Sequence, residues 1–543
     1  MPAVGLTPGR WTVAALVIAA LAAVPILAVA ISAPASGLDA LARLANTVLP
    51  EYIANTALLM AATGTIAAVV GVGCAWLVSA AEFPGRRILA WALVLPLAVP
   101  AYIGAYIYGD LLDFSGPVQS ALRAATGWGV DAYWFPEIRS LSGGAFVLGF
   151  VLYPYVYLLA RAAFASQSRR QFRAARSLGA GPGRAFWQVA LPAARPAIAG
   201  GLALVLMETL ADFGVAQYFA IPTFSTGIFR TWLSMGDRSA AMGLAAIMLM
   251  FVVALVALEA ASRRGQSAGR DGLAEISGEP LVELSATGKA LALLACLVPV
   301  LLGFVIPAAH LTALSFDPRA IGAMGELSSY IADSLWLGIA AALVCMIAAL
   351  LLGFSRTRSN SRVARGAIRL ATLGYALPGA LLAVGLLAPL GTVDVALTRF
   401  ARDSLGYGGG LLLTGTSIIL IYALSVRFLT VAFNSVEGGL AKIPPQLDAA
   451  ARSLGAKPAR VLARIYAPLL RPSLFAAAAL VFIDTLRELP ATLILRPCNL
   501  ETLATRTYRL ASDERLVEAS IPALILFAAG LIPVLLLART SRK

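Results

Sequence analysis

Four acidic residues interrupt otherwise apolar stretches of this sequence, and they form two pairs with the same spacing. Glu208 and Asp212 form the first pair, Asp484 and Glu488 form the second, and each pair follows an uncharged run of 12 residues. The spacing of four residues predicts that both acids of a pair share one helix face. Ionisable groups inside a membrane usually face a bundle interior or a water path, where carboxylates attract cations and suit hard, oxygen-seeking metals. The four acids therefore predict a translocation path for a cation.

The same acids also fit a structural or gating role, and the residues alone leave both roles open. Arg487 lies between Asp484 and Glu488 and would neutralise that pair, and ionic pairs often hold membrane helices together. A cage of four ionised carboxylates would also resist releasing a cation, so we expect no tightly bound metal. One span would add phenol oxygens to a path, although interfacial belts make tyrosine common at such depths; these phenols belong to Tyr102, Tyr106 and Tyr108.

Several other chemistries are excluded by the residue types that the sequence lacks. Cys74, Cys296, Cys345 and Cys498 are scattered without a CxxC spacing, so neither a zinc site nor a disulfide framework is expected. His310 is the only histidine, which rules out a histidine-based catalytic triad and a zinc site with several histidines. The sequence has no GxxxxGK[ST] phosphate loop. We therefore expect a chain that is no enzyme and binds no cofactor, and any ATP must be used by a partner polypeptide.

The composition places these residues in a membrane. Of the 543 residues, 59% are hydrophobic and 13% are charged, and so much apolar surface requires a nonaqueous solvent. Pro196–Met207 and Pro472–Ile483 are two apolar spans that end at the acids. Ten further uncharged stretches, each of roughly 20 residues or more, are long enough to cross about 30 Å of hydrocarbon as helices: 11–38, 52–81, 88–109, 140–160, 239–258, 290–309, 334–355, 370–393, 404–426 and 519–538. We expect an all-α integral membrane protein with about twelve transmembrane helices.

The placement of positive charge predicts the orientation of these spans. With a cytoplasmic N-terminus, the cytoplasmic segments hold 28 of the 42 Lys and Arg residues and the outer segments hold 13. This bias agrees with the positive-inside rule, so both termini are expected in the cytoplasm. The net charge of +14 then reflects topology and attraction to membrane lipid. Nucleic acid is not an expected partner, because no basic patch is interleaved with aromatic residues.

The sequence contains an internal repeat. Residues 174–212 and 450–488 are identical at 17 of 39 positions, at an offset of 276 residues. Six spans in each unit give both copies the same orientation, which predicts two parallel six-helix repeats related by an axis along the membrane normal. The expected repeats are 1–258 and 290–543. Residues 259–289, rich in Gly, Ser and both signs of charge, are the expected cytoplasmic linker.

The heptapeptide AARSLGA occurs in both repeats, within the long, arginine-rich cytoplasmic loops expected at 161–195 and 431–471. In each copy, two alanines and a leucine are spaced to share one face of a short helix, a glycine ends that helix, and a proline enforces a turn. Such a smooth face, flanked by arginines, suits a partner protein with carboxylates, whereas a helix lying on lipid is the alternative. The residues concerned are Ala174, Ala175, Arg176, Leu178, Gly179 and Pro182, and then Ala450, Ala451, Arg452, Leu454, Gly455 and Pro458.

These loops resemble the cytoplasmic EAA loop of ABC importer permeases. The family pattern is EAA, three residues, Gly, nine residues, an aliphatic residue, two residues and usually Pro. The glutamate of the pattern is replaced in both copies, by Arg173 and by Ala449. The remaining positions are filled by Ala174, Ala175, Gly179, Val189 and Pro192 in the first copy, and by Ala450, Ala451, Gly455, Ile465 and Pro468 in the second.

The resemblance implies a permease of the bacterial inner membrane, with a coupling helix in each loop that docks into a cytoplasmic ATPase subunit. It also implies two copies of that ATPase and a periplasmic substrate-binding protein as partners. The coupling residues would be Arg173 to Gly179 in the first copy and Ala450 to Gly455 in the second.

Two permease units in one chain are similar to the ferric-iron importer permeases, as are three stretches at the ends of the units, Glu208–Gly214, Glu488–Pro497 and Ala511–Arg515. The expected cargo is therefore ferric iron. Permeases for thiamine, phosphonate, polyamine and other small solutes share this architecture and remain alternatives. A secondary transporter with six plus six spans, driven by an ion gradient, and a membrane scaffold that transports nothing are the rivals from other classes.

Overall fold

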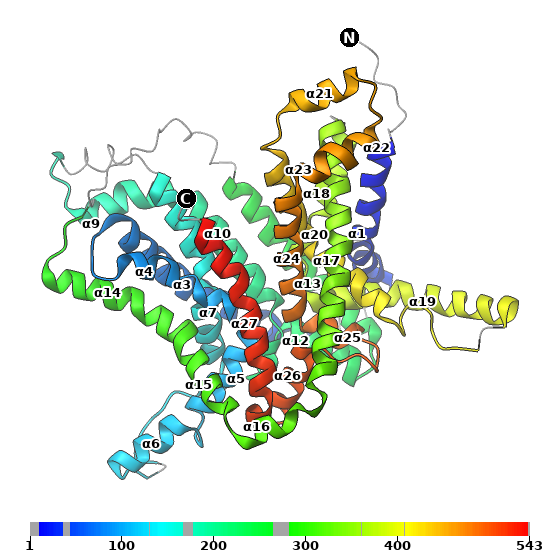
Figure 1. Cartoon of the computed structure of the whole chain (residues 1–543). Helices are drawn as coiled ribbons and strands as arrows, with labels where there is room; N and C mark the ends of the chain where they lie inside the picture. Colours follow the sequence, from blue (N-terminus) through cyan, green and yellow to red (C-terminus); the bar gives the residue numbers. More distant parts are fainter. Residues whose placement is uncertain are drawn as a thin grey trace. The chain divides into compact units, whose positions relative to one another are not determined.

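The computed structural model describes residues 10–35, 44–129, 131–166, 177–263, 282–359, 361–406 and 408–540, and most of them are helical (Figure 1). Over these ranges, the only β-type pairing is an isolated bridge between Ala81 and Val282. The expected all-α fold is confirmed.

The described residues include ten helices that are long and apolar enough to cross a membrane. Two more helix pairs pass the same test together but are sharply bent, so that the number of spans reaches twelve if each bent pair is one span. This agrees with the expected number of about twelve. The bent pairs are Arg86–Ala98 with Ala101–Thr126, at 92°, and Pro458–Leu469 with Arg471–Arg487, at 75°.

The stretch 88–109, expected as one span, is broken at Pro100. This residue precedes α5 (Ala101–Leu112) with φ −60° and ψ 129°, and a proline cannot continue the helix before it. Pro378 has nearly the same backbone angles, φ −59° and ψ 143°, where it precedes α19 (Gly379–Leu405). The prolines therefore set the same helix start in both repeats.

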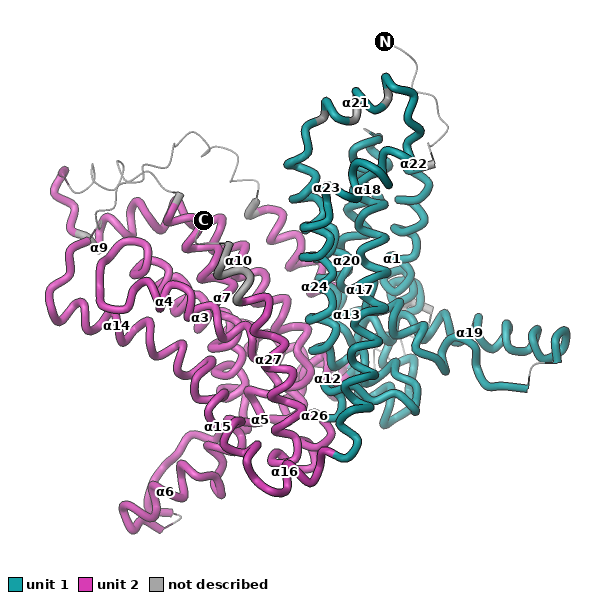
Figure 2. Tube along the Cα trace, viewed as in Figure 1, with its two compact units in different colours: residues 1–44, 228–249, 325–506 teal, residues 45–227, 250–324, 507–543 magenta. Residues whose placement is uncertain are grey.

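The chain forms two compact units that are interleaved in sequence (Figure 2). Unit 1 comprises residues 1–44, 228–249 and 325–506, and unit 2 comprises residues 45–227, 250–324 and 507–543. The units differ from the consecutive repeats expected at 1–258 and 290–543, because each unit contains the first helical segment of the other repeat. A sequence repeat and a packing unit are thus different divisions of this chain, and the expected repeat boundaries stay a prediction.

Unit 2 is built around α3 (Leu49–Ala80), α7 (Leu141–Ser166) and α10 (Leu191–Ala211). Glycines allow these helices to approach closely. A Cβ atom added at Gly71 of α3 would lie 3.0 Å from a carbonyl oxygen of α7, and one at Gly201 of α10 would lie 2.8 Å from a Cα atom of α7. Small residues at helix contacts are what membrane helices use to associate, since lipid gives no hydrophobic drive for association.

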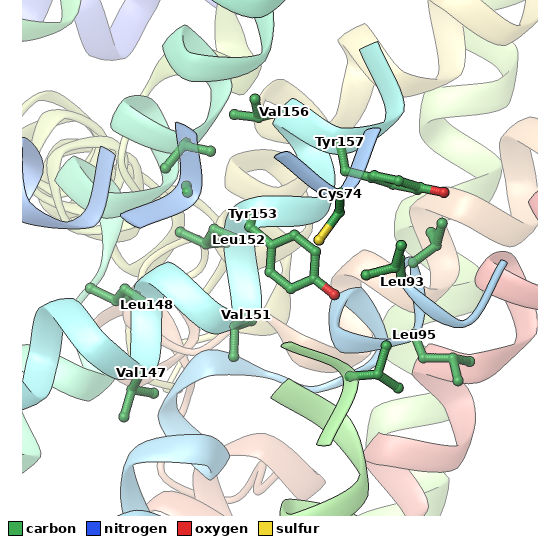
Figure 3. Packing of buried hydrophobic residues seen from close by; sticks show 14 of the residues in the cluster. Cys74, Leu93, Leu95, Val147, Leu148, Val151, Leu152, Tyr153, Val156 and Tyr157 are labelled. Atoms are coloured by element: carbon green, nitrogen blue, oxygen red, sulfur yellow. The ribbon is translucent and has the colours of Figure 1, made fainter. Parts of the chain in front are cut away.

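The core of unit 2 is filled by aromatic and aliphatic side chains of α7 and its neighbours (Figure 3). Tyr157 donates a hydrogen bond of 2.7 Å to the carbonyl oxygen of Ala90, which lies in α4 (Arg86–Ala92). Tyr153 points into the core beside Cys74 and is fully buried. Among the described residues, no hydrogen-bond partner is present for the Tyr153 hydroxyl.

The first helical segment of the second repeat packs within unit 2 as α14 (Ala286–Val300) and α15 (Ile306–Ser315). His310 Nε2 of α15 lies 2.7 Å from Asp110 Oδ2 of α5. Tyr108, expected as an oxygen donor for a path, instead donates its hydroxyl to a backbone carbonyl of the segment between α14 and α15. Polar contacts therefore join this segment to helices of the first repeat.

Unit 1 is built around α17 (Leu327–Arg358), α20 (Ser417–Leu440) and α24 (Arg471–Arg487), and α1 (Arg10–Ala35) packs onto it. A Cβ atom added at Gly385 would lie 2.7 Å from a carbonyl oxygen of α1, so glycine permits this contact. Tyr422 of α20 donates a hydrogen bond of 2.6 Å to another carbonyl oxygen of α1. The first helix of the first repeat is thus part of the unit formed mainly by the second repeat.

Local structure repeats as the sequence does. A single π-helical turn occurs at Phe186–Ala190 and again, 276 residues later, at Leu462–Tyr466. Both follow a short helix that begins with a proline, α9 (Pro182–Ala185) and α22 (Pro458–Val461). The repeats also share a hydrogen bond between distant segments: Phe224 N–H to Thr56 Oγ1 at 3.3 Å, and Leu503 N–H to Ser334 Oγ at 2.8 Å.

Candidate functional site

Each acid pair is divided by the end of a helix. α10 and α24 end one residue before Asp212 and Glu488, whose backbones are extended with ψ 133° and 126°. Glu208 and Asp484 lie one turn earlier, inside the helices, and are half-buried. The prediction that both acids of a pair share one helix face is therefore wrong, because the helix does not continue to the second acid.

In unit 2, the second acid begins the next helix. Asp212 accepts hydrogen bonds from the N–H groups of Ala216 at 3.0 Å and Val215 at 3.5 Å. Both donors belong to the first turn of α11 (Gly214–Tyr218). A carboxylate is favoured there, because the first N–H groups of a helix have no partner within it.

In unit 1, Glu488 occupies the matching position before α25 (Pro490–Leu495). Its carboxylate accepts hydrogen bonds from Ala491 N–H at 3.0 Å, from Thr492 N–H at 2.9 Å and from the Thr492 hydroxyl at 2.8 Å. The two repeats therefore use an acid in the same way at the same helix break.

Glu488 also forms an ion pair that the sequence did not reveal. Its Oε1 lies 2.9 Å from Nη1 of Arg427, and the side chains are 1% and 14% exposed. We expected Arg487 to supply a positive charge at this acid, whereas the structure places Arg427, 61 residues earlier, against it. A Cβ atom at Gly379 would lie 2.6 Å from both groups, so glycine leaves room for the pair.

A group of tyrosines surrounds the acid of unit 2. The Tyr106 ring contacts the rings of Tyr102 and Tyr218, with centroids 5.8 Å and 4.6 Å apart. Asp212 and Tyr508 lie close enough to act electrostatically on the Tyr106 phenol. Tyr106 is fully buried, and no partner for its hydroxyl is present among the described residues. Asp212 and the four tyrosines Tyr102, Tyr106, Tyr218 and Tyr508 are called the phenol cluster below.

The acids and phenols supply negative charge and oxygen atoms without forming a metal cage. In the described part of the chain, no three His, Cys, Asp or Glu side chains are grouped so as to hold a metal ion. The four acids are also divided between the units, two in each. What each unit presents is a helix break with one capping acid.

The two AARSLGA copies end in the same backbone conformation. Gly179 and Gly455 have positive φ angles of 87° and 75°, in the left-handed region that favours glycine and ends helices. The predicted helix ends at these glycines are confirmed. The preceding residues, Leu178 and Leu454, are 88% and 86% exposed. Each loop therefore presents a leucine to solvent at a matching position.

The second copy shows which side chains of the loop face solvent. It is the end of α21 (Pro445–Ser453), where Ala456 N–H donates to the carbonyl oxygen of Ala451 at 3.0 Å. The Ala451 side chain is buried, and Ala450 and Leu454 are exposed. In the first copy, four predicted coupling residues lie outside the described residues: Arg173, Ala174, Ala175 and Arg176.

Comparison with known proteins supports the duplicated organisation. The Fe(3+)-transport system permease protein FbpB 2 of Haemophilus influenzae is 25% identical over 504 residues, which is 91% of this chain and 91% of that protein. A probable ABC transporter permease of Sinorhizobium fredii is 25% identical over 476 residues, 82% of this chain and 79% of that one. The sulfate transport system permease protein CysW of Escherichia coli is 28% identical over 213 residues, 38% of this chain and 70% of that one.

A family model covers most of the chain in two copies. Its description is "Binding-protein-dependent transport system inner membrane component", and it matches residues 67–264 and 345–541. Each match includes one AARSLGA loop and one helix break with its capping acid. This chain therefore belongs to the binding-protein-dependent transport system inner membrane components, the permeases of ABC importers, and carries two permease units in one polypeptide.

Proposed function

We propose that this chain imports ferric iron across the bacterial inner membrane after a periplasmic binding protein has delivered it. The observation that carries this proposal is the similarity to the Fe(3+)-transport system permease of Haemophilus influenzae, which extends over 91% of both chains and so includes both repeats. Asp212 and its phenolic neighbours support it, because carboxylate and phenol oxygens favour a hard cation.

The energy would come from two copies of an ATPase subunit that dock at the AARSLGA loops. Single exposed leucines are ordinary on protein surfaces. Leu178 and Leu454, however, occupy matching positions of a repeat with matching glycine caps, which favours one contact made twice. In unit 1, α21 and α22 lie at one end and α25 at the other (Figure 1). With both termini in the cytoplasm, the loops face the ATPase, and the opposite end faces the binding protein.

We retain Glu208, Asp212 and Asp484 as candidate residues of the translocation path. Glu488 has a different role in this proposal, because its charge is balanced by Arg427 and its oxygens already accept three hydrogen bonds from α25. It stabilises the helix break of unit 1. The cation would then meet an unequal pair of repeats, with the free negative field on the side of the first.

An anion is the alternative cargo. The sulfate permease of Escherichia coli and a putative 2-aminoethylphosphonate permease of Salmonella typhimurium are also relatives, matched over 38% and 25% of this chain. Each of these matches spans about one repeat or less, and half-buried acids such as Glu208 would repel an anion. Ferric iron is therefore the cargo that we propose.

Uptake by right-side-out membrane vesicles tests the cargo and the energy source together. We expect radiolabelled ferric iron to accumulate only when ATP is sealed inside and iron-loaded periplasmic extract is outside. Vesicles from a strain that lacks this chain should accumulate none. Iron uptake that persists on an ion gradient without ATP would contradict the ATPase-driven importer. Uptake of radiolabelled sulfate or phosphonate instead of iron would contradict the cargo and leave the permease assignment intact.

A further inference from the structure

We propose that the phenol cluster is a transient contact site for the cargo, through which a hard, oxygen-seeking metal cation passes. This inference rests on the proposed function and deepens it. It assigns the contact to one permease unit, the one formed mainly by the first repeat.

The unpartnered hydroxyl of Tyr106 is the first observation behind this proposal. Tyr106 is fully buried, and the two ring contacts that hold it would be kept by phenylalanine. A buried hydroxyl without a partner costs about 1–3 kcal/mol, so packing alone favours phenylalanine at this position. A ligand that takes up the phenol oxygen during transport accounts for the hydroxyl.

The surroundings of Tyr106 select the kind of ligand. Asp212 is the nearest acid that acts on its phenol, and the other neighbours that do so are tyrosines, Tyr102, Tyr218 and Tyr508. The set thus offers several oxygen donors and one negative charge, which suits a hard cation and disfavours an anion. One carboxylate also gives modest affinity, and a transport path must release what it binds.

The ring of Tyr218 is positioned from both sides. It fills the space left by Gly109, where an added Cβ atom would lie 2.7 Å from its Cε1 atom. The Arg139 guanidinium lies 5.2 Å from the centroid of the same ring and is itself 3.1 Å from Asp113. Tyr218 is half-buried, so it lies between the buried Tyr106 and this more exposed ionic group. The cluster therefore leads from the outside of unit 2 inward.

The second repeat lacks the phenols. Counting from the matching prolines Pro100 and Pro378, the positions of Tyr102 and Tyr106 are taken by Ala380 and Val384, and the position of Tyr218 is taken by Ile494. The matching acid is the ion-paired Glu488. A purely architectural need would act on both repeats alike, whereas the phenols and the acid without an arginine partner occur together in one.

Tyr106→Phe is the decisive variant, and Tyr153→Phe is its matched control. Both residues are fully buried tyrosines of unit 2 whose hydroxyls have no partner among the described residues. Tyr153, however, has cysteines and Tyr157 as its electrostatic neighbours and no carboxylate. Removing either hydroxyl leaves the fold intact, because neither makes a hydrogen bond, and only Tyr106→Phe removes a cargo contact.

The measurement is ATP-dependent uptake of radiolabelled ferric iron in membrane vesicles, with thermal stability of the purified permease as the second readout. Loss of an oxygen contact to a charged ligand is worth on the order of a tenfold change, so we expect a drop of about that size for Tyr106→Phe and for Asp212→Asn. Tyr153→Phe should keep wild-type uptake, and all variants should melt near the wild type. Gallium(III), which is hard and redox-inert, should compete with iron in the wild type.

Each remaining outcome decides against a definite statement. Equal uptake by Tyr106→Phe and wild type, with iron imported by the wild type, overturns the cluster as a cargo contact and leaves the proposed function standing. Equal losses for Tyr106→Phe and Tyr153→Phe overturn it as well, because a general packing defect then explains both. A wild type that imports no iron overturns the proposed function, and the cation site with it.

Discussion

Replacing Leu178 and Leu454 together by aspartate is expected to abolish ATP-driven uptake while the permease still folds and inserts. Both side chains are almost fully exposed, so the permease itself gains little from them. Burying one leucine in a partner is worth about 1.5–3 kcal/mol, and aspartate would also have to lose its hydration at the same contact. Copurification of the ATPase subunit with the tagged permease measures docking, and ATP-dependent uptake in vesicles measures coupling.

Leu405→Asp is the matched control for this experiment. Leu405 is 78% exposed and also directly precedes a glycine with positive φ, Gly406 at 66°, at a helix end. It lies outside the two loops, so its replacement should leave copurification and uptake unchanged. ATPase copurification at the wild-type level in the Leu178→Asp and Leu454→Asp double variant would contradict docking at these loops and favour helices that lie on lipid.

The features that sequence predicted correctly are local ones. The glycines after AARSLGA have positive φ because few other residues adopt that conformation at low cost. Pro182 and Pro458 begin short helices at matching places, since proline fits the first turn and lacks the N–H group that would be unpaired there. Such signals act within a few residues and occur twice, so the repeat could be recognised without any knowledge of packing.

The helix breaks at the acids were missed although local signals were present. Pro490 stands two residues after Glu488 and begins α25, and an acid just before a proline is typical of a helix start. Asp212 is likewise a common residue before a first helical turn. The long apolar runs before both acids favoured an uninterrupted span, and the hydrophobic signal of a span does not register a break near its end.

The interleaving of the two units lies beyond what the sequence pattern can show. α1 packs onto unit 1, and α14 packs within unit 2, although each belongs to the other repeat. Hydrophobicity and charge specify that a helix crosses the membrane and in which direction, but an apolar helix surface fits many neighbours. Glycines such as Gly71 and Gly385 mark close contacts, yet they do not identify the partner helix.

The ion pair of Glu488 was equally hidden, because its partner is 61 residues away in the sequence. One residue carried a signal in retrospect. Arg427 follows the uncharged stretch 404–426 at the end of an expected span, and a charge at such a place usually has a partner. The sequence offered two candidates for that partner, the acids of the eleventh span, but no means to choose between Asp484 and Glu488.

Replacing Arg427 by valine, the residue found 276 positions earlier at Val151, is expected to lower the free energy of unfolding of unit 1 by about 3–5 kcal/mol. Glu488 would keep its hydrogen bonds from α25 but would remain as a buried charge without compensation, since its side chain is only 1% exposed. Thermal unfolding of the purified permease in detergent, followed by tryptophan fluorescence, measures the loss. Arg356→Val removes an ion pair with Glu437 that is much more exposed, and its expected cost is at most about 1 kcal/mol.

The Arg427→Val and Glu488→Gln double variant separates the effect of the charge from the effect of the arginine side chain. Glutamine can still accept hydrogen bonds from Ala491 and Thr492, and it leaves no charge in the membrane, so the double variant should recover most of the stability that Arg427→Val loses. If the double variant stays as unstable as the single one, lost packing of the arginine and not an unpaired charge is the cause. If it recovers stability and also imports iron at the wild-type rate, the negative charge of Glu488 serves the fold and not the cargo, as the inequality of the two repeats predicts.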